Sequence, residues 1–180
     1  MAGELGHCRC PQVGGNSYAP VGYGKAGSFE GFCSGGRIAD LGKTMAMEHL
    51  QRGTPAGFCP TWQDLEHLTA QRIAQEAEKG DPVALEVYEC SGQRLGAALA
   101  LLTDLLNPDR IVIGSIYARS QKLLQDAAFR VWEQEALPLN RQACEVVAAK
   151  LGEYLGDVAA LSIALLGSGQ PPASGITYDF

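Results

Sequence analysis

The chain has 180 residues, of which 46% are hydrophobic and 19% are charged, and its formal net charge is −6. This composition is typical of one globular domain and excludes a disordered chain and a coiled-coil rod. An acidic chain lacks the clustered basic surface that phosphate backbones require, so we expect no direct contact with nucleic acid.

Targeting signals and disulfides are not expected either. No apolar run reaches the roughly 18–20 residues that a membrane-spanning helix needs, so we expect no membrane association. The first residues, Met-Ala-Gly-Glu-Leu-Gly-His, contain neither a basic leader nor an apolar signal core, which favours the cytoplasm. The six cysteines are irregularly spaced in a chain too large to need disulfides, so reduced thiols are expected. Cys90 and Cys144 stand in apolar stretches and are predicted to be small core residues.

The first predicted elements follow a long irregular segment. Residues 1–35 are rich in Gly, Pro, Ser, Asn and Tyr and show no sustained period, which predicts loop. A loop of that length in a compact domain usually serves as a lid, a binding loop or a metal knuckle. Helical spacing then begins near Ile38 and stops at Gly53. A second helical stretch begins at Thr61 and runs, in one or two pieces, to Gly80.

The clearest predicted element is a long helix that begins at Asp81-Pro82 and ends at Asn107. Its apolar residues recur at spacings of three and four on two sides, so we expect the helix to be sandwiched between layers. Gly92 and Gly96 leave room on it for a close-packed neighbour.

The rest of the chain alternates strands and helices. Residues 110–114 are a short β-branched run with the pattern of a buried parallel strand. A helix at about 120–136, a strand at 144–148 and a helix at about 154–166 are predicted to follow. This order predicts an α/β domain with a partly parallel sheet.

Two carboxylates and one imidazole stand on glycine-rich segments near the start of the chain. Glu4 and His7 belong to Gly-Glu-Leu-Gly-His, and Glu30 belongs to Gly-Ser-Phe-Glu-Gly-Phe-Cys-Ser-Gly. A carboxylate can accept hydrogen bonds from neighbouring sugar hydroxyls, and a histidine ring adds a donor or an acceptor. The residues could therefore hold a polyhydroxylated ligand, and solvated loop residues are the other interpretation of the same pattern.

Four segments resemble motifs of the ROK family (repressor, open reading frame, kinase) in the family's order. Residues 2–7 match its Gly-Glu-hydrophobic-Gly-His element, and residues 29–35 are similar to its Leu-Glu-x-x-x-Ser-Gly element. Residues 107–115 resemble Asn-Pro-x-x-Ile-Val-Ile-Gly-Gly, and residues 151–157 resemble a late Leu-Gly…Gly element. Each motif is weak by itself, but the likeness covers nearly the whole chain in register.

The resemblance implies a fold and a division of the chain. The fold is the C-terminal lobe of the actin-like ATPase (ribonuclease H-like) fold, truncated at its N-terminus and carrying a large helical insertion. The implied single domain, 1–180, has a sugar-binding loop region at 1–35 and a helical region at 36–106. A nucleotide-side βαβα region follows at 107–167, and a tail occupies 168–180.

The resemblance also implies ligands. Glu4, His7 and Glu30 would contact sugar hydroxyls, and Gly114 and Ser115 would lie against the adenosine side of a nucleotide. Ligands bind outside the carboxyl ends of the strands in such sheets, which suits the position of the last two residues. ATP with Mg is the implied cofactor of the complete protein.

The chain departs from the family at a zinc site. ROK proteins typically hold zinc through the histidine at the position of His7 and through three cysteines near the second glutamate. Counted back from Glu30, these cysteine positions hold Val21, Tyr23 and Ser28, which are not usual zinc ligands.

A second donor set gives little support for zinc. His7, Cys8, Cys10 and Cys33 carry four donors, but the adjacent His7 and Cys8 fit one tetrahedron poorly. We therefore expect no zinc, and we expect aromatic side chains such as Tyr23, with the turns of the glycine-rich loop, to organise this segment instead.

The resemblance implies a C-terminal fragment of an ATP-dependent hexose or amino-sugar kinase, with the sugar-sensing lobe of a ROK repressor as the alternative. In ROK kinases the phosphate loops and the catalytic aspartate precede the Gly-Glu element, so the chain alone is expected to be inactive. A homodimer formed through residues 36–106 is expected, and a separately encoded N-terminal half is a further possible partner. The origin of such a short chain and the identity of the sugar are left open.

Overall fold

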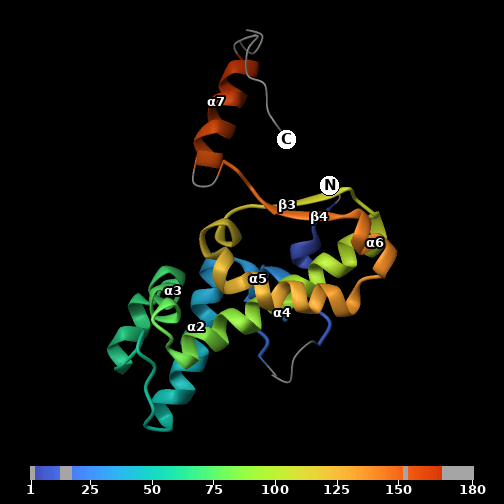
Figure 1. Ribbon diagram of the computed structural model, residues 1–180. Helices are drawn as coiled ribbons and strands as arrows, with labels where there is room; N and C mark the ends of the chain where they lie inside the picture. Colours follow the sequence, from blue (N-terminus) through green and yellow to red (C-terminus); the bar gives the residue numbers. More distant parts are fainter. Residues whose placement is uncertain (1–2, 13–17, 152–153, 168–180) are drawn as a thin grey trace.

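Figure 1 shows the computed structural model, which describes residues 3–12, 18–151 and 154–167. The predicted tail at 168–180 lies outside the described residues. The elements in chain order are η1 (Leu5–His7), β1 (Val21–Gly22), β2 (Lys25–Ala26), α1 (Phe29–Cys33), α2 (Gly35–Gln51), η2 (Trp62–His67), α3 (Ala70–Glu78), α4 (Pro82–Leu106), β3 (Arg110–Ile113), α5 (Ile116–Glu135), α6 (Pro138–Ala143), β4 (Glu145–Ala148) and α7 (Leu155–Gly167). The described chain is an α/β protein, as the sequence predicts.

Cap residues set the ends of the helices in the first half of the chain. Gly53 and Gly80 follow α2 and α3 with φ of 72° and 92°, a left-handed conformation that glycine adopts without strain. Asp81 then caps α4, and its carboxylate accepts a hydrogen bond from the Ala84 N–H at 2.8 Å. Asn107 ends α4 in the left-handed region, with φ of 44°. The predicted ends of these three helices are confirmed.

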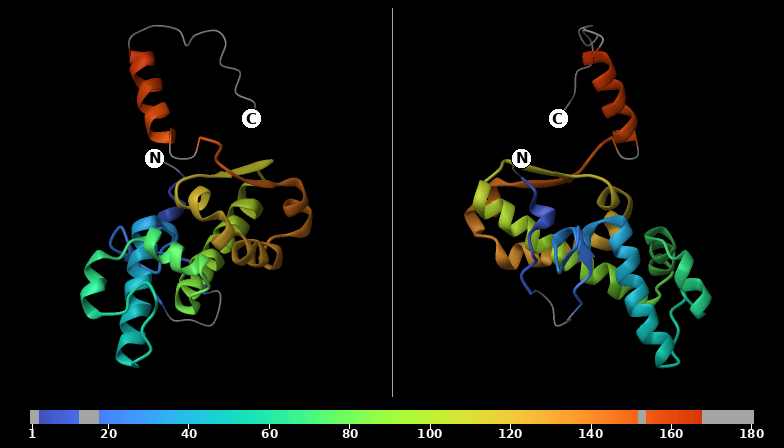
Figure 2. Two further views of the ribbon diagram at one scale, coloured as in Figure 1. Left: turned by 60° about the vertical axis from the view of Figure 1, so that its left-hand side comes forward. Right: turned by 180° about the vertical axis from the view of Figure 1, so that it is seen from behind.

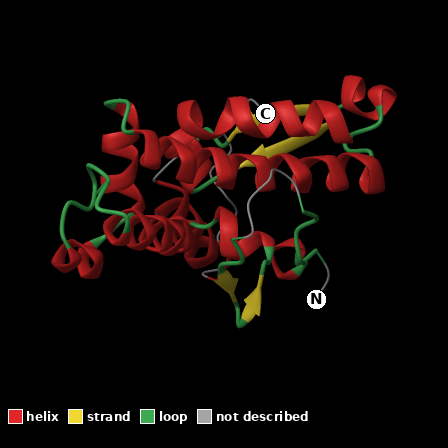
Figure 3. Ribbon diagram, turned by 90° about the horizontal axis from the view of Figure 1, so that it is seen from below, coloured by secondary structure: helices red, strands yellow, loops and turns green. Residues whose placement is uncertain are grey.

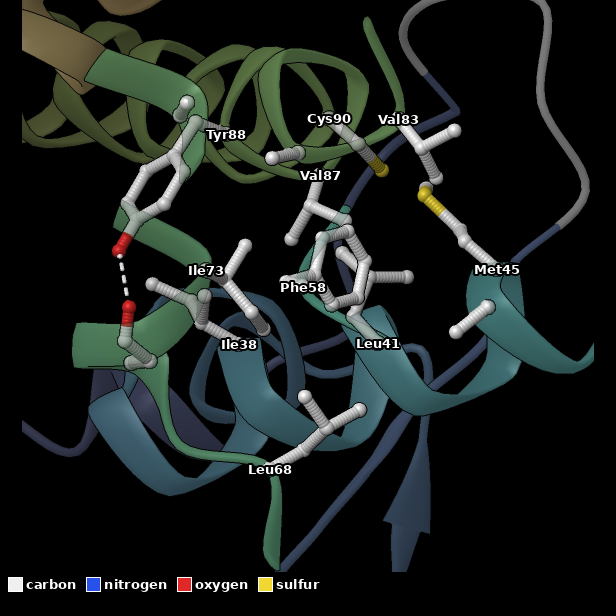
Figure 4. Close-up of a cluster of buried hydrophobic side chains, with 14 of the residues drawn as sticks. Ile38, Leu41, Met45, Phe58, Leu68, Ile73, Val83, Val87, Tyr88 and Cys90 are labelled. Atoms are coloured by element: carbon white, nitrogen blue, oxygen red, sulfur yellow. Dashed lines mark hydrogen bonds between the residues drawn. The ribbon is translucent and has the colours of Figure 1, made fainter. Parts of the chain in front are cut away.

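The largest hydrophobic core lies where α2, α3 and α4 meet (Figure 4). The labelled side chains include Ile38 and Leu41 from α2, Ile73 from α3 and Val87 from α4, each at most 1% exposed. Burying one such side chain stabilises the fold by roughly 1.5–3 kcal/mol. The Tyr88 hydroxyl donates to the Ala70 carbonyl at 2.9 Å and so joins α4 to the start of α3.

Helix α4 packs closely against α5 at two glycines. A Cβ added at Gly92 would lie 2.8 Å from the Cβ of Ala127, and one added at Gly96 would lie 2.8 Å from the Cβ of Val131. The predicted close neighbour is therefore confirmed and is α5. The expectation that α4 is covered on both sides holds only in part, because Leu105 near its end is 77% exposed.

Within the described residues, the strands form two separate two-stranded sheets (Figure 3). Strands β1 and β2 form an antiparallel hairpin, and β3 pairs with β4 in parallel, from Arg110 opposite Glu145 to Ile113 opposite Ala148. The parallel pairing is confirmed, but the expectation of a buried strand is wrong, since Val112 is 59% exposed. The reason is that Ile111 and Ile113 pack against the core while the other face of the pair is not covered within the described residues.

Three short-range features differ from the predicted elements. The loop region 1–35 contains helix α1, and helix α6 precedes β4; both are too short to show a helical period. Helix α5 begins at Ile116, and the non-helical φ/ψ of Ser120 (−118°, 28°) breaks its first turns from the rest. Cys90 and Cys144 are 1% and 7% exposed, which confirms both as core residues.

Helix α7 stands away from the rest of the protein (Figures 1 and 2). Leu161, Ile163 and Leu166 on it are 64%, 71% and 73% exposed. None of the helices in the described ranges combines the length and the apolar character needed to cross a bilayer.

Candidate functional site

A single 3₁₀ turn holds two of the three residues predicted to contact sugar. Glu4 caps η1 and His7 ends it, and the His7 N–H donates to the Glu4 carbonyl at 3.1 Å. Residues three apart lie one above the other in a 3₁₀ turn, so Glu4 and His7 are neighbours. Glu4 is exposed and His7 is half-buried, and both are within reach of a ligand.

Helix α1 brings the third predicted residue to the same turn. Glu30 lies in the first turn of α1, which Ser28 caps by accepting a hydrogen bond from the Gly31 N–H at 3.2 Å. A Cβ added at Gly6 would lie 3.6 Å from the Cβ of Glu30 and 3.7 Å from its Oε2. The Glu30 carboxylate therefore lies against the middle of the turn that bears Glu4 and His7.

A cavity of about 400 Å³ connects this turn with the end of strand β3. Its lining includes Gly6, Glu30 and Ser34 on one side and Gly114 and Ser115 on the other. The structure thus brings Glu30, Gly114 and Ser115 to one cavity. Glu4 and His7 are not among the residues that line it. Gly6 and Ser34 were not predicted as lining residues, although they belong to the motif segments 2–7 and 29–35.

The turn between β3 and α5 has an unusual backbone. Ser115 has φ of 54° and ψ of −126°, a conformation that glycine favours, and the family motif has glycine at this position. Helix α5 starts directly after it, and the non-helical Ser120 separates residues 116–119 from the rest of that helix. A second cavity, of about 650 Å³, adjoins the first at Ile116, and its lining includes the cations Lys43 and Arg119 and the carboxylates Asp40 and Glu78.

The donors near His7 do not fit the zinc site that the resemblance implies. Cys10 and Cys33 pack against the main core. Burial raises the pKa of the Cys10 thiol to about 12 and also raises the pKa of Cys33, so both are protonated and poor ligands. Cys8 is exposed, and no group of three or more His, Cys, Asp or Glu in the described ranges is arranged to hold a metal ion.

Aromatic and polar contacts hold the loop around His7. The His7 ring stacks on Tyr23 of the β1–β2 hairpin, with ring centroids 4.5 Å apart. The Lys25 Nζ donates to the His7 carbonyl at 2.6 Å. This contact of Lys25 was not predicted from the sequence. The two-residue turn Tyr23-Gly24, which directs Lys25 back toward η1, is the sequence feature that could have indicated it.

The comparisons with known proteins identify the family. The family model for ROK matches residues 1–166. This chain belongs to the ROK family. The glucokinase of Halalkalibacterium halodurans is 31% identical to this ROK chain over 156 residues, which are 87% of the chain and 45% of that protein. The DNA-binding transcriptional dual regulator NagC of Escherichia coli is 28% identical over 149 residues, 83% of the chain and 34% of that protein.

Solved ROK structures share the fold of this chain. A ROK family glucokinase from Streptomyces griseus in complex with glucose and AMPPNP superposes with a TM-score of 0.70 at 22% identity, covering 91% of this chain and 51% of that one. A ROK family transcriptional regulator, a homolog of the E. coli MLC protein, gives a TM-score of 0.63 at 27% identity, covering 81% and 34%. The ROK chain spans half the length or less of the curated relatives and about half the length or less of these structures.

Proposed function

We propose that this ROK chain is the sugar-contacting C-terminal lobe of an ATP-dependent hexose or amino-sugar kinase. Glu4, His7 and Glu30 bind sugar hydroxyls in this proposal. The observation that carries the proposal is that the Glu30 carboxylate lies beside Gly6. Gly6 belongs to the turn that bears Glu4 and His7. A carboxylate can accept hydrogen bonds from two neighbouring hydroxyls, and the glucose bound to the similar S. griseus glucokinase supports a hexose ligand.

ATP is the proposed second ligand of the complete protein. Gly114 and Ser115 would lie against the adenosine side of the nucleotide, which would extend past Ile116 into the cavity of about 650 Å³. Mg²⁺ would be bound mainly through the phosphates and water. The AMPPNP of the S. griseus complex supports a nucleotide of this kind.

The 180-residue chain is expected to bind sugar without phosphorylating it. Phosphoryl transfer needs a base near the acceptor hydroxyl and a grip on the phosphates. Glu30 is the one carboxylate among the residues that line the cavity of about 400 Å³, and the proposal assigns it to sugar binding. A base would have to come from a further protein half, in the same chain or in a separate one.

A sugar-sensing lobe of a ROK repressor is the second candidate function. Ser115 favours it, because its Cβ projects from a turn where the family motif has glycine and where a kinase would place the adenosine side of its nucleotide. A sensor needs only the sugar. In this alternative, DNA contacts would come from residues outside this acidic segment.

We further propose a cytoplasmic homodimer. The helical region 36–106 is the candidate interface, because it carries Met47, Trp62 and Leu85 with exposures of 38%, 51% and 43%. Apolar residues of this size are enriched at the centre of protein interfaces.

The sugar proposal is tested by isothermal calorimetry with glucose, mannose and N-acetylglucosamine. We expect weak, saturable binding of at least one sugar, and we expect Glu30→Gln to weaken it about tenfold or more, since a bond to a charged acceptor is lost. Glu66→Gln, at an exposed position of η2, is the matched control and should bind as the wild type does. Wild-type protein that binds none of the sugars would contradict the proposal. AMPPNP binding by the chain would favour the kinase over the sensor.

A further inference from the structure

The hairpin beside the candidate sugar site carries an aromatic residue in a conformation unusual for it. Tyr23 and Gly24 connect β1 and β2 with φ of 49° and 73°, and two positive φ values define a type I′ turn. Asparagine and glycine are the usual residues at the first position, because a large side chain is strained in the left-handed region. A tyrosine at this position therefore requires a compensating interaction.

The compensating interaction is the contact with His7. The rings of Tyr23 and His7 are 4.5 Å apart and inclined by 23°, which is a stacked arrangement. Tyr23 is 70% exposed, so burial in a core does not account for its placement. Stacking between two rings stabilises their relative orientation as well as their contact.

Hydrogen bonds join the segments that carry the two rings. The Lys25 Nζ donates to the His7 carbonyl at 2.6 Å, which joins β2 to the end of η1. The Phe29 N–H donates to the Cys8 carbonyl at 3.0 Å, and the Cys10 N–H donates to the Gly27 carbonyl at 2.8 Å. The segment after His7 is thus tied to the segment that joins the hairpin to α1, which keeps the hairpin that carries Tyr23 beside η1.

We propose that Tyr23 is a positioning residue, whose ring, carried on the type I′ turn, holds the His7 imidazole in its ligand-binding orientation without a metal ion. The inference rests on the proposed function for the role of His7. It explains how the loop is ordered although the cysteine positions of the family's zinc site hold Val21, Tyr23 and Ser28. It also agrees with the Cys10 thiol, which packs against the core instead of beside His7.

The stack is tested first in the sugar-free protein by NMR of the histidine ring protons. A ring stacked on tyrosine has its proton signals displaced by the ring current, and the His7 signals are assigned by their loss in His7→Gln. We expect Tyr23→Phe to keep the displacement and Tyr23→Asn to abolish it, while the melting temperature of Tyr23→Asn stays close to that of the wild type, because asparagine suits the turn. Undisplaced His7 signals in the wild type would overturn the inference.

The positioning role is tested by sugar affinity in the same variants. Tyr23→Asn should weaken the best-binding hexose about two- to tenfold, and Tyr23→Phe should restore wild-type affinity. Tyr154→Asn removes a tyrosine that is similarly exposed, at 73%, and should have no effect. Equal losses in Tyr23→Phe and Tyr23→Asn, or no loss in Tyr23→Asn, would overturn the inference. Failure of the wild type to bind any sugar would instead count against the proposed function, and the His7 signals would still report on the stack.

The metal-free part of the inference is tested by elemental analysis and chelation. Protein purified without chelator should contain no stoichiometric zinc, and dialysis against EDTA should change neither its His7 signals nor its melting temperature. One zinc per chain whose removal shifts the His7 signals would overturn the proposal.

Discussion

At the scale of single residues, Ser115 shows how one side chain can carry strain at the point where a ligand is expected. Its φ of 54° and ψ of −126° place it in a region that is sparsely populated for residues with a Cβ. It stands between a strand and a 20-residue helix, so the backbone around it is fixed by both. The surrounding structure, and not the residue itself, therefore determines its conformation.

Replacing this residue by glycine should relieve the strain. Ser115→Gly is expected to raise the free energy of unfolding by about 1 kcal/mol, measured by urea denaturation. Ser34→Gly is the matched control, because Ser34 has an ordinary extended backbone (φ −86°) and makes no side-chain cap hydrogen bond. The control should lose a few tenths of a kcal/mol. A loss of stability in Ser115→Gly as large as in the control would contradict the strained turn.

The buried thiols predict how stability depends on pH. Burial raises the pKa of Cys10 to about 12, so the folded protein keeps a proton that the unfolded chain releases above its thiol pKa of about 8.5. Proton release then favours the unfolded state as the pH rises, and the stabilisation present below that pH is progressively lost between about pH 8.5 and pH 12. Urea midpoints should fall over the accessible part of this range, from pH 9 to pH 10.5.

Two variants separate the contribution of Cys10 from that of other groups. Cys10→Ala should make the decline of the urea midpoint with pH shallower. Cys8→Ala removes an exposed thiol of the same segment and should leave the decline unchanged. Identical slopes for the wild type and Cys10→Ala would show that the Cys10 thiol does not titrate as described.

At the scale of elements, the contact between α4 and α5 depends on glycine. A Cβ at Gly96 would meet the Ala128 carbonyl oxygen and would lie 2.8 Å from the Cβ of Val131, so the helices would have to separate. Gly96→Ala should lower the free energy of unfolding by about 1–3 kcal/mol in spite of its better helix propensity. Gly36→Ala, in α2 where nothing lies within 4 Å, should raise it by up to about 1 kcal/mol. A stabilised Gly96→Ala variant would contradict the close packing.

The sequence predicted the long elements and missed the short ones, for a physical reason. Caps such as Gly53, Gly80 and Asp81 act locally, so their residue types mark helix ends in the sequence. Helix α1 has one turn, and its existence depends on the Ser28 cap and on packing of Phe29 and its neighbours, which no periodic pattern reveals. The exposure of β3 likewise could not be predicted from its own residues, because it depends on how many strands join the sheet and on what covers each face.

The candidate site could be predicted in its residue types and not in its geometry. The motif resemblance pointed to Glu4, His7 and Glu30, and the structure places all three at or beside η1. The stack of His7 on Tyr23 could not be foreseen, because it depends on the direction in which the hairpin presents the Tyr23 ring. The motifs indicate which residues belong to the site, but the contact of His7 with Tyr23 depends on the conformation of the turn that joins β1 to β2.

At the scale of the whole molecule, the chain leaves apolar surface at its end. Helix α7 is apolar on nearly all sides, and a helix of that kind is normally buried. The cavity of about 400 Å³, in contrast, joins η1, α1 and the turn after β3. We therefore expect the proposed sugar contacts to be testable on this chain, and the proposal assigns phosphoryl transfer to a larger assembly.

The most direct test of the central claim is backbone-amide NMR of the ¹⁵N-labelled chain during titration with the best-binding hexose. We expect the chemical-shift changes to concentrate on Gly6, His7 and Gly31, around the Glu30 carboxylate, and to be lost in Glu30→Gln. Changes confined to α3 or α7, or an unperturbed spectrum at saturating sugar, would contradict a carbohydrate site at this turn.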